Sequence, residues 1–359
     1  MTEYSCVDCF SGAGGLALGL SNAGIKPLLS FDIDRHCIDS FGMNTKYFNH
    51  VALCEGIDSM LDGRLLNMVG KKKGELFLLA GGPPCQGFSV QRIGKDDDPR
   101  NLLVLQYAQL IEEVMPQYFL MENVSGIRGK RGKTVLAELE RRLTTAGYQL
   151  HEQLLDAQDY GVPQRRKRFV VVGERLGSKP CCYEFPQPVT VRHTVRDTIG
   201  TLPEPPKDGS PHPDYPLHRR DRLSELNKKR LSALKEGQGR DSLPEELLAD
   251  CHKRSSATIG HRNVYGRMSW DDVAPTITAR FDSFTRGQFG HPDQLRSISL
   301  LEGALLQTFP SDFSFSGNKV EIARQIGNAV PPVLAEAIGR SIIECEQRKG
   351  GDGCNSTRW

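Results

Sequence analysis

One cysteine stands in an unusually constrained turn in the first quarter of the chain. The stretch Gly81-Gly82-Pro83-Pro84-Cys85-Gln86-Gly87-Phe88-Ser89 follows the apolar run Leu76–Ala80, which predicts a buried strand. A Gly-Gly-Pro-Pro break ends a strand abruptly, and loops at the carboxyl ends of strands hold the chemistry of open α/β enzymes. The Cys85 thiol is therefore a candidate nucleophile, although a cysteine in a turn can also be a small buried hydrophobe.

A glycine-rich turn and an acidic residue form a second candidate site. Residues 8–15 read Asp-Cys-Phe-Ser-Gly-Ala-Gly-Gly, a predicted strand that runs into a turn and opens a helix. Such a turn lets the backbone approach a ligand closely. Asp32 ends the next predicted strand, where it could bind ribose hydroxyls or cap a helix. The pattern indicates a nucleoside cofactor without distinguishing a dinucleotide from an adenosyl compound.

Charged groups accompany two further predicted strands. Glu122 follows the apolar run Tyr118–Met121, where a carboxyl group can protonate a substrate ring nitrogen, cap a helix or form a surface ion pair. The run Gln164-Arg165-Arg166-Lys167-Arg168 precedes the β-branched run Phe169–Gly173. Strand alternation would put Arg166 and Arg168 on one face, pointing into the cleft, whereas a run of cations can also be a solvated or phosphate-binding patch.

Strand-like and helix-like patterns alternate over about the first 175 residues and must position these groups. The alternation predicts an α/β fold, a doubly wound parallel sheet of Rossmann-like type. Proline and polar residues crowd the sequence beyond this point. We expect a catalytic and cofactor-binding domain over residues 1–175, completed by residues 318–359, and a second, smaller irregular domain over residues 176–317. The expected strands are Val7–Phe10, Pro27–Phe31, Leu76–Ala80, Tyr118–Met121 and Phe169–Gly173. The expected helices are Leu16–Ala23, Arg35–Phe41, Leu102–Val114, Val135–Ala146, Arg222–Lys235, Ser299–Gln307 and one after Pro332.

Composition narrows the class of protein. The 359 residues are 38% hydrophobic and 25% charged, an ordinary globular balance. No apolar run approaches the roughly 20 residues that span a bilayer, and the N-terminus lacks a signal-peptide pattern, so we expect a cytoplasmic protein. Cys6 and Cys9 form a CxxC, but no partner follows at zinc spacing, so no metal is predicted and the ten cysteines are expected to be free thiols.

The net charge of +2 conceals an uneven distribution. Residues 160–300 hold 24 Lys or Arg and 17 Asp or Glu, whereas the rest of the chain holds 22 and 27. A basic segment within an otherwise acidic chain indicates a polyanionic partner.

Together with the segment Gln325–Val330, these stretches closely resemble the cytosine-5 DNA methyltransferase family. Five separated motifs occur in the family's order and cover the chain except for the variable stretch after residue 175. The resemblance implies a bacterial enzyme, of a restriction–modification system or an orphan, that acts as a monomer near the nucleoid. It would transfer a methyl group from S-adenosylmethionine to carbon 5 of a flipped cytosine in a specific double-stranded DNA sequence. The motifs are Phe10–Gly15, Gly82–Ser89, Glu122–Val124, Gln164–Arg168 and Gln325–Val330.

The resemblance also implies roles for individual residues. The Cys85 thiolate would add to carbon 6 of the cytosine, and Glu122 would protonate ring nitrogen 3. Arg166 and Arg168 would assist at the base carbonyl and its phosphate and position Glu122. The helix after Gln325 would return to the first domain to complete the cofactor cleft. The implied cofactor-binding residues are Phe10, Gly12, Gly14, Leu16, Asp32, Ile33, Pro84, Leu103, Asn328 and Val330.

One stretch departs from the family's pattern. The family usually places an aspartate before an isoleucine in its third cofactor stretch, against the adenine amino group. Here the stretch reads Cys54-Glu55-Gly56-Ile57-Asp58, with glycine at that place. Either Glu55 or Asp58 could supply the missing carboxylate.

The variable basic segment matches the place of the family's target-recognition domain. Its stretches Thr276–Phe281 and Arg286–Phe289 offer hydroxyl, arginine and glutamine groups that suit base edges and phosphates, although the recognised DNA sequence does not follow from them.

Three alternatives remain open from the residues. A related tRNA cytosine methyltransferase would typically have Pro-Phe-Thr after the Cys-Gln pair, whereas Gly87-Phe88-Ser89 follows the DNA-modifying pattern. A nicotinamide dehydrogenase would share the glycine turn and Asp32, but gives no reason for the prolines beside Cys85. A catalytically dead DNA-binding module is disfavoured because Cys85, Glu122 and both arginines are present.

Overall fold

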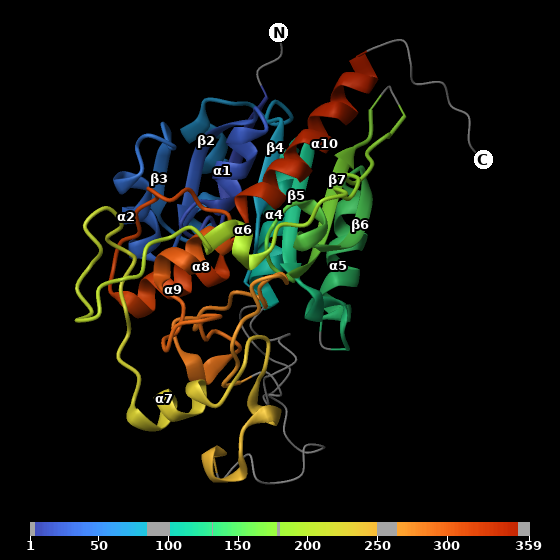
Figure 1. Ribbon diagram of the computed structural model, residues 1–359. Coiled ribbons are helices and arrows are strands. Elements are labelled where there is room, and N and C mark those ends of the chain that lie inside the picture. The colour runs from blue at the N-terminus through green and yellow to red at the C-terminus, as the bar shows by residue number, and fades with distance from the viewer. Residues whose placement is uncertain (1–3, 85–100, 131, 178–179, 250–263, 351–359) are drawn as a thin grey trace. The chain divides into compact units, whose positions relative to one another are not determined.

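The computed structural model divides the chain into two compact units and describes residues 4–84, 101–130, 132–177, 180–249 and 264–350 (Figure 1). Unit 1 comprises residues 1–156, 167–188 and 330–359, and unit 2 comprises residues 157–166 and 189–329. The division we expected lay at residues 175 and 318. Unit 2 therefore also takes in the short segment 157–166 and the chain from residue 318 to 329.

A seven-stranded sheet forms the centre of unit 1, in the order β3-β2-β1-β4-β5-β7-β6. Strands β1 to β5 are parallel, but β7 runs antiparallel to both of its neighbours. The prediction of a wholly parallel sheet is therefore wrong at this edge. The connection from β6 to β7 holds no α-helix, and a parallel pair would need a longer crossover. The strands are β1 (Ser5–Cys9), β2 (Lys26–Asp32), β3 (Val51–Cys54), β4 (Leu78–Gly81), β5 (Tyr118–Val124), β6 (Tyr148–Asp156) and β7 (Lys167–Arg175).

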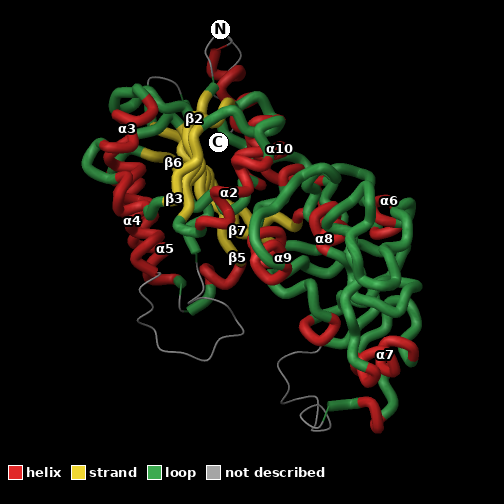
Figure 2. The backbone as a smooth tube through the Cα atoms, turned by 90° about the vertical axis from the view of Figure 1, so that its left-hand side faces the viewer, coloured by secondary structure: helices red, strands yellow, loops and turns green. Residues whose placement is uncertain are grey.

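Helices cover both faces of this sheet. Figure 2 shows α3, α4 and α5 on one side of the strands and α2 and α10 on the other. Helix α10 packs along α1, so the last helix of the chain returns to the first unit as expected. The helices of unit 1 are α1 (Gly15–Asn22), α2 (Arg35–Met43), α3 (Arg64–Val69), α4 (Asn101–Val114), α5 (Lys133–Thr145) and α10 (Pro332–Gly350).

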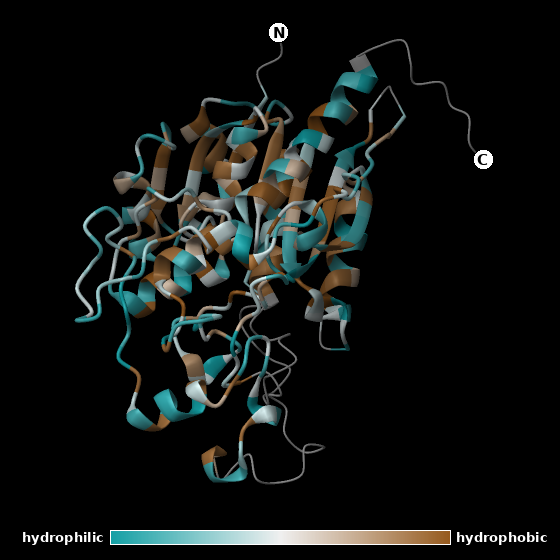
Figure 3. Cartoon of the chain, viewed as in Figure 1, coloured by the Kyte–Doolittle hydropathy of each residue, from teal (hydrophilic) through white to brown (hydrophobic). Residues whose placement is uncertain are grey.

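The central strands carry the core of unit 1. All five residues of β1 and all four of β4 are buried, and the aliphatic face of α4 packs on them. The edge strands β3 and β6 were not predicted, because the apolar run of β3 is only four residues long and β6 mixes polar with apolar residues. Strand β6 is largely exposed, and Figure 3 shows it as a hydrophilic strand at the border of the sheet.

Unit 2 is mostly irregular in its described residues. Its short helices are joined by long loops (Figure 2). A fully buried ion pair supports this loop-rich structure: Arg296 donates to both carboxylate oxygens of Glu302 at 2.6 and 2.7 Å. The helices are α6 (Val195–Ile199), α7 (Glu225–Ser232), α8 (Leu300–Leu306) and α9 (Lys319–Asn328). Among all helices of the described residues, none combines the length and the apolarity that crossing a bilayer requires.

Candidate active site

The two most informative motifs begin side by side in the sheet. Strands β1 and β4 are neighbours, with Cys9 paired to Gly81 at their carboxyl ends. The strand order reverses at this point, because β2 lies on the other side of β1 and β5 on the other side of β4. Open α/β sheets bind ligands in the crevice outside such a reversal. The glycine turn after β1 and the Gly82-Pro83-Pro84 loop after β4 therefore border one site, and Cys85, the predicted nucleophile, lies just outside the described residues.

A carboxylate and an arginine face each other at the end of β5. Arg168 Nε lies 2.6 Å from Glu122 Oε1, and both side chains are only 12% exposed. The antiparallel register explains the contact: Arg168 pairs with Val124, so Glu122 is its diagonal neighbour on the same face of the sheet. The pair that the sequence predicted is therefore assembled, with the arginine holding one oxygen of the carboxylate.

The same stretch of β5 also contacts the loop that leads to Cys85. The buried Asn123 side chain donates a hydrogen bond to the carbonyl oxygen of Pro83 at 3.0 Å. A Cβ atom on Gly82 would lie 3.3 Å from Glu122 Oε2. The backbone of the loop at Gly82 therefore lies directly beside this carboxylate. No role was predicted for Asn123, and the one signal for it in the sequence is its position directly after Glu122 in the motif Glu122–Val124.

Arg166 is not part of this pair. Its guanidinium is 1% exposed and donates to the carbonyl oxygens of Ile277, Gly327 and Ala329 at 2.9, 3.0 and 2.7 Å, all within unit 2. The expectation that Arg166 and Arg168 share one face and point together is wrong, because β7 begins only at Lys167 and strand alternation does not reach Arg166.

The glycine turn is tied to the end of β2. The Asp32 carboxylate accepts hydrogen bonds from the backbone N–H of Gly12 and of Asp34, each at 2.9 Å. The cap of α2 is Asp34, whose side chain accepts from the His36 N–H, so Asp32 is not the helix cap. Phe10 holds a φ of 57°, a strained conformation for a residue other than glycine and one that is concentrated at functional sites.

The backbone of this turn is uncovered at Gly12. This residue has a φ of +53°, and a Cβ atom there would meet no atom of the described residues within 4 Å. A glycine backbone without a side chain, next to the Asp32 carboxylate, suits a nucleoside. The nucleoside can approach the backbone closely, and the carboxylate can accept hydrogen bonds from its ribose hydroxyls. The turn is supported from below by Asp8, which is fully buried and accepts from the Ala17 N–H in the first turn of α1. Burial raises the pKa of Asp8 well above its ordinary value.

An exposed apolar side chain and a carboxylate stand at the ends of β2 and β3. Ile33 is 78% exposed, directly after Asp32. A Cβ atom on Gly56 would lie 3.6 Å from Ile33 Cγ2 and only 2.4 Å from Asp58 Oδ1, so the Asp58 carboxylate fills the space of the missing side chain. Glu55 is committed elsewhere, because Arg64 and Ser59 donate to it and lower its pKa to about 2.

The remaining predicted cofactor residues fall into two groups. Leu16 is buried in α1, Leu103 packs on the core from α4, and Pro84 is the last described residue before Cys85. The Gln325–Val330 motif is divided between the units: Asn328 ends α9 in unit 2, whereas the buried Val330 begins the last segment of unit 1. Gly14, the cap residue of α1, completes the set.

Comparison with known proteins now identifies the fold as one that solved methyltransferases share. A prophage-encoded E. coli protein described as a DNA modification methyltransferase is 24% identical, with a TM-score of 0.72 over 96% of this chain and 99% of that chain. The chain belongs to the C-5 cytosine-specific DNA methylase family, whose model matches residues 4–344.

Two curated relatives are similar over most of their length. The type II methylase M.HgiDII of Herpetosiphon aurantiacus is 36% identical over 94% of both chains. The type II methyltransferase M1.HphI of Haemophilus parahaemolyticus is 33% identical over 94% of this chain and 86% of its own. The predicted family is confirmed, and with it the enzyme class, DNA (cytosine-5-)-methyltransferase.

Proposed function

We propose that this chain methylates carbon 5 of a flipped cytosine within a specific sequence of double-stranded DNA, acting as a monomer, either beside a restriction endonuclease or as an orphan methylase. The observation that carries the proposal is the Glu122–Arg168 pair, which lies against the loop leading to Cys85 at the strand-order reversal. A base cannot be reached inside a duplex, so the target must leave the stack to meet these groups.

The side chains divide the chemistry of the base among them. The Cys85 thiolate adds to carbon 6 and so makes carbon 5 electron-rich. Glu122 holds and protonates ring nitrogen 3, which takes up the charge that the addition creates. Arg168 holds the Glu122 carboxylate in place and offers its remaining N–H groups to the base carbonyl. When the carbon-5 proton leaves, the bond to Cys85 breaks and the thiolate is restored.

Arg166 acts in this proposal by positioning rather than by touching the base. Its three carbonyl acceptors fix the backbone at Ile277, within the candidate recognition stretch Thr276–Phe281, and at Gly327 and Ala329 in the Gln325–Val330 motif. A buried arginine that satisfies three carbonyl groups at once holds two distant segments of unit 2 in one arrangement.

The residues around the glycine turn fit S-adenosylmethionine, which supplies the methyl group when bound. Gly12 leaves room for close approach, the Asp32 carboxylate can accept from ribose hydroxyls, and the exposed Ile33 offers an apolar face for adenine. Asp58, rather than Glu55, takes the place of the carboxylate that the family has at position 56. Phe10, Gly14, Leu16, Pro84, Leu103, Asn328 and Val330 are proposed to complete the cleft.

Unit 2 is proposed to read the DNA. Of the polar groups that the sequence singled out, Gln288 is used internally, since its amide donates to the carbonyl oxygens of Gly237 and Arg267. Arg280 and Arg286 remain exposed. Arg280 also lines a largely polar pocket of about 190 Å³ together with Arg222 and Lys319, and the carboxylates of Asp221 and Asp282 in the same pocket pair with Lys319 and Arg280. Arginine and lysine side chains on such a surface suit phosphates and guanine edges.

The proposal is tested with a duplex in which fluorine replaces hydrogen at carbon 5 of cytosine. Because the proton that must leave is missing, the enzyme should stay covalently attached to the DNA in denaturing gels, in the presence of S-adenosylmethionine. Wild-type protein and the Cys85→Ala variant are compared, and labelled methyl transfer to ordinary duplex DNA and to tRNA is measured in parallel. An adduct in Cys85→Ala would overturn the nucleophile, and preferential transfer to tRNA would overturn the substrate. No transfer to either would indicate a DNA-binding module.

A further inference from the structure

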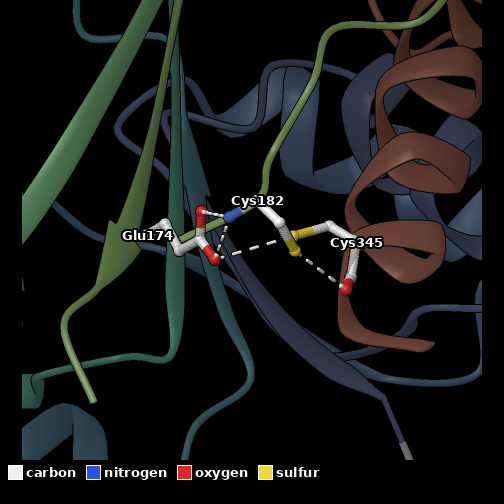
Figure 4. Close-up of side chains that lie close together, drawn as sticks. All are labelled: Glu174, Cys182 and Cys345. Atoms are coloured by element: carbon white, nitrogen blue, oxygen red, sulfur yellow. Dashed lines mark hydrogen bonds between the residues drawn. The ribbon is translucent and has the colours of Figure 1, made fainter. Parts of the chain in front are cut away.

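A buried carboxylate, Glu174, brings two cysteines together at the edge of the sheet where β5 begins. Cys182 lies in the loop after β7 and Cys345 lies on α10, and both are free thiols. Their sulfur atoms are 3.3 Å apart, and Figure 4 shows the two side chains directed toward one another. We propose that Cys182 and Cys345 form a redox-sensitive pair that closes to a disulfide bond when the protein meets a low-molecular-weight disulfide.

The backbone on both sides of the pair is already fixed. The fully buried Glu174 carboxylate accepts from the N–H groups of Cys182 and Tyr183 at 3.0–3.2 Å, which anchors the loop to β7. Lys349, one turn after Cys345 on α10, lies 2.6 Å from the same carboxylate. One carboxylate thus holds both partners, so closure needs movement of the sulfur atoms rather than of the chain.

Two further contacts join the loop to α10. Arg348 donates to the carbonyl oxygen of Cys182 at 2.9 Å, and the Tyr183 hydroxyl lies 3.1 Å from that of Ser341. A disulfide has a sulfur–sulfur distance of about 2.05 Å. The required approach is therefore about 1.3 Å, which small side-chain rotations can supply between backbones held at five points.

The surroundings also decide the order of the exchange. Cys345 is fully buried, and burial raises its pKa to about 12, so its thiolate is scarce. Cys182 is partly exposed and is the sulfur that an external disulfide can reach. The Cys182 thiolate attacks one sulfur of the reagent, releasing one thiol. The Cys345 sulfur then attacks Cys182 in the mixed disulfide and releases the second thiol. Both protein thiol protons end on the two released thiols, and the reagent is reduced by two electrons.

A metal ion is the other chemistry that Glu174, Cys182 and Cys345 could support, because their ligand atoms lie within 4.8 Å of one another. The charge of Lys349 argues against it. Its ammonium group already neutralises the carboxylate at 2.6 Å, and a divalent cation would have to share that position. Formation of a disulfide places no additional positive charge beside Lys349, so this site favours a disulfide over a bound metal ion.

The disulfide bond would connect the chain before and after the large segment of unit 2. Residues 189–329 lie wholly between Cys182 and Cys345, and the closed loop would span 163 positions. Closing so long a loop restricts the unfolded chain strongly. We therefore expect oxidation to raise the melting temperature by roughly 3–8 °C.

The experiment treats the full-length protein with oxidised glutathione, then blocks the remaining thiols and maps the peptides without reduction. The expected product is a Cys182–Cys345 peptide pair two hydrogen atoms lighter than the separate peptides, together with the rise in melting temperature. Cys181→Ser is the matched control, because this neighbouring thiol should be dispensable, whereas Cys182→Ser and Cys345→Ser should both abolish the pair. Unfolding curves of the reduced variants identify any that fail to fold.

Each other outcome would overturn the proposal. A lasting glutathione adduct on Cys182, or a link between Cys181 and Cys182, would mean that Cys345 cannot complete the exchange. Stoichiometric zinc in the purified wild-type protein that is lost in Cys182→Ser would mean that the sulfur atoms are metal ligands. An unchanged thiol count would mean that the pair is inert.

Discussion

Two arginines separated by one residue have entirely different partners. Arg168 lies on β7 and holds Glu122 at 2.6 Å, beside the loop that leads to Cys85. Arg166 precedes the strand, is 1% exposed and donates to three carbonyl groups of unit 2. Both residues are arginines in the same short motif, so residue type does not explain their different partners. The difference arises because β7 begins at Lys167, between the two.

In our proposal, that difference separates a group that acts on substrate from a group that stabilises the fold. An arginine beside a carboxylate at a ligand crevice changes the energy of a reacting state. An arginine buried among carbonyl groups mainly changes the energy of folding, since removing it leaves several buried acceptors without a donor. Substitutions at the two positions should therefore move different observables.

The largest expected effect is the loss of turnover when the carboxylate pair is altered. Glu122→Gln should lower kcat by roughly 100-fold or more, because the amide keeps the size of the side chain but cannot deliver a proton. Arg168→Ala should lower kcat to a similar extent, and the double variant should be little worse than either single one, since the pair acts as a unit. Steady-state methylation of duplex DNA measures this. A kcat within a few-fold of wild type for Glu122→Gln would remove the carboxylate from the mechanism.

The next largest effect is on folding. Arg166→Ala should lower the free energy of unfolding by about 3–5 kcal/mol, because the carbonyl groups of Ile277, Gly327 and Ala329 would be buried without a donor. Urea unfolding of Arg166→Ala and Arg168→Ala, side by side, tests the contrast. Arg166→Lys should recover only part of the loss, since one ammonium group cannot reach three acceptors. An unchanged unfolding midpoint with a large loss of kcat would instead make Arg166 a catalytic residue.

The contrast between the two arginines also shows which parts of the structure can be predicted from the sequence. The motifs predicted the family, and the apolar runs predicted the carboxyl ends of β1 and β4 to within one residue. Strand β5 was expected to end at Met121 but continues to Val124, so Glu122 lies within the strand rather than after it. The direction of β7 was beyond reach, since the parallel or antiparallel course of a strand depends on its connection and not on its composition. Strand β3 was missed because its apolar run is only four residues long, and β6 was missed because its sequence mixes polar with apolar residues.

Side-chain partners were the hardest part to predict. Nothing in the run Gln164–Arg168 indicates that its third residue turns away from the strand, because the acceptors of Arg166 lie more than 100 positions further along the chain. Asn123 was overlooked for a similar reason: it and Pro83 stand in two separate motifs, and nothing local shows that the Asn123 side chain donates to the Pro83 carbonyl 40 positions earlier. Local patterns thus predict which elements form, whereas long-range hydrogen bonds decide which partner each of two like residues contacts.

Glu55 and Asp58 repeat the comparison on a smaller scale, as two like charges with different partners. Glu55 is held by Arg64 at 2.5 and 2.9 Å, whereas the Asp58 carboxylate stands over Gly56 beside the exposed Ile33. Asp58→Asn should weaken S-adenosylmethionine binding roughly 5–10-fold, which corresponds to about 1–1.4 kcal/mol, because a charged acceptor for the adenine amino group becomes a neutral one. Glu55→Gln removes the same charge nearby and should change the dissociation constant less than about 2-fold, since its carboxylate serves an exposed ion pair.

A cofactor analogue in which a carbonyl oxygen replaces the adenine amino group sharpens this test. Wild-type protein should bind the analogue poorly, because two acceptors would face each other. Asp58→Asn should bind it at least as well as wild type does, because the new amide N–H can donate to that oxygen. Isothermal titration calorimetry of wild type, Glu55→Gln and Asp58→Asn with S-adenosylmethionine and with the analogue measures which of the two compounds each protein binds more tightly. Equal losses in the Glu55 and Asp58 variants would mean that net charge alone sets the affinity. An unchanged preference in Asp58→Asn would mean that this carboxylate does not meet the adenine.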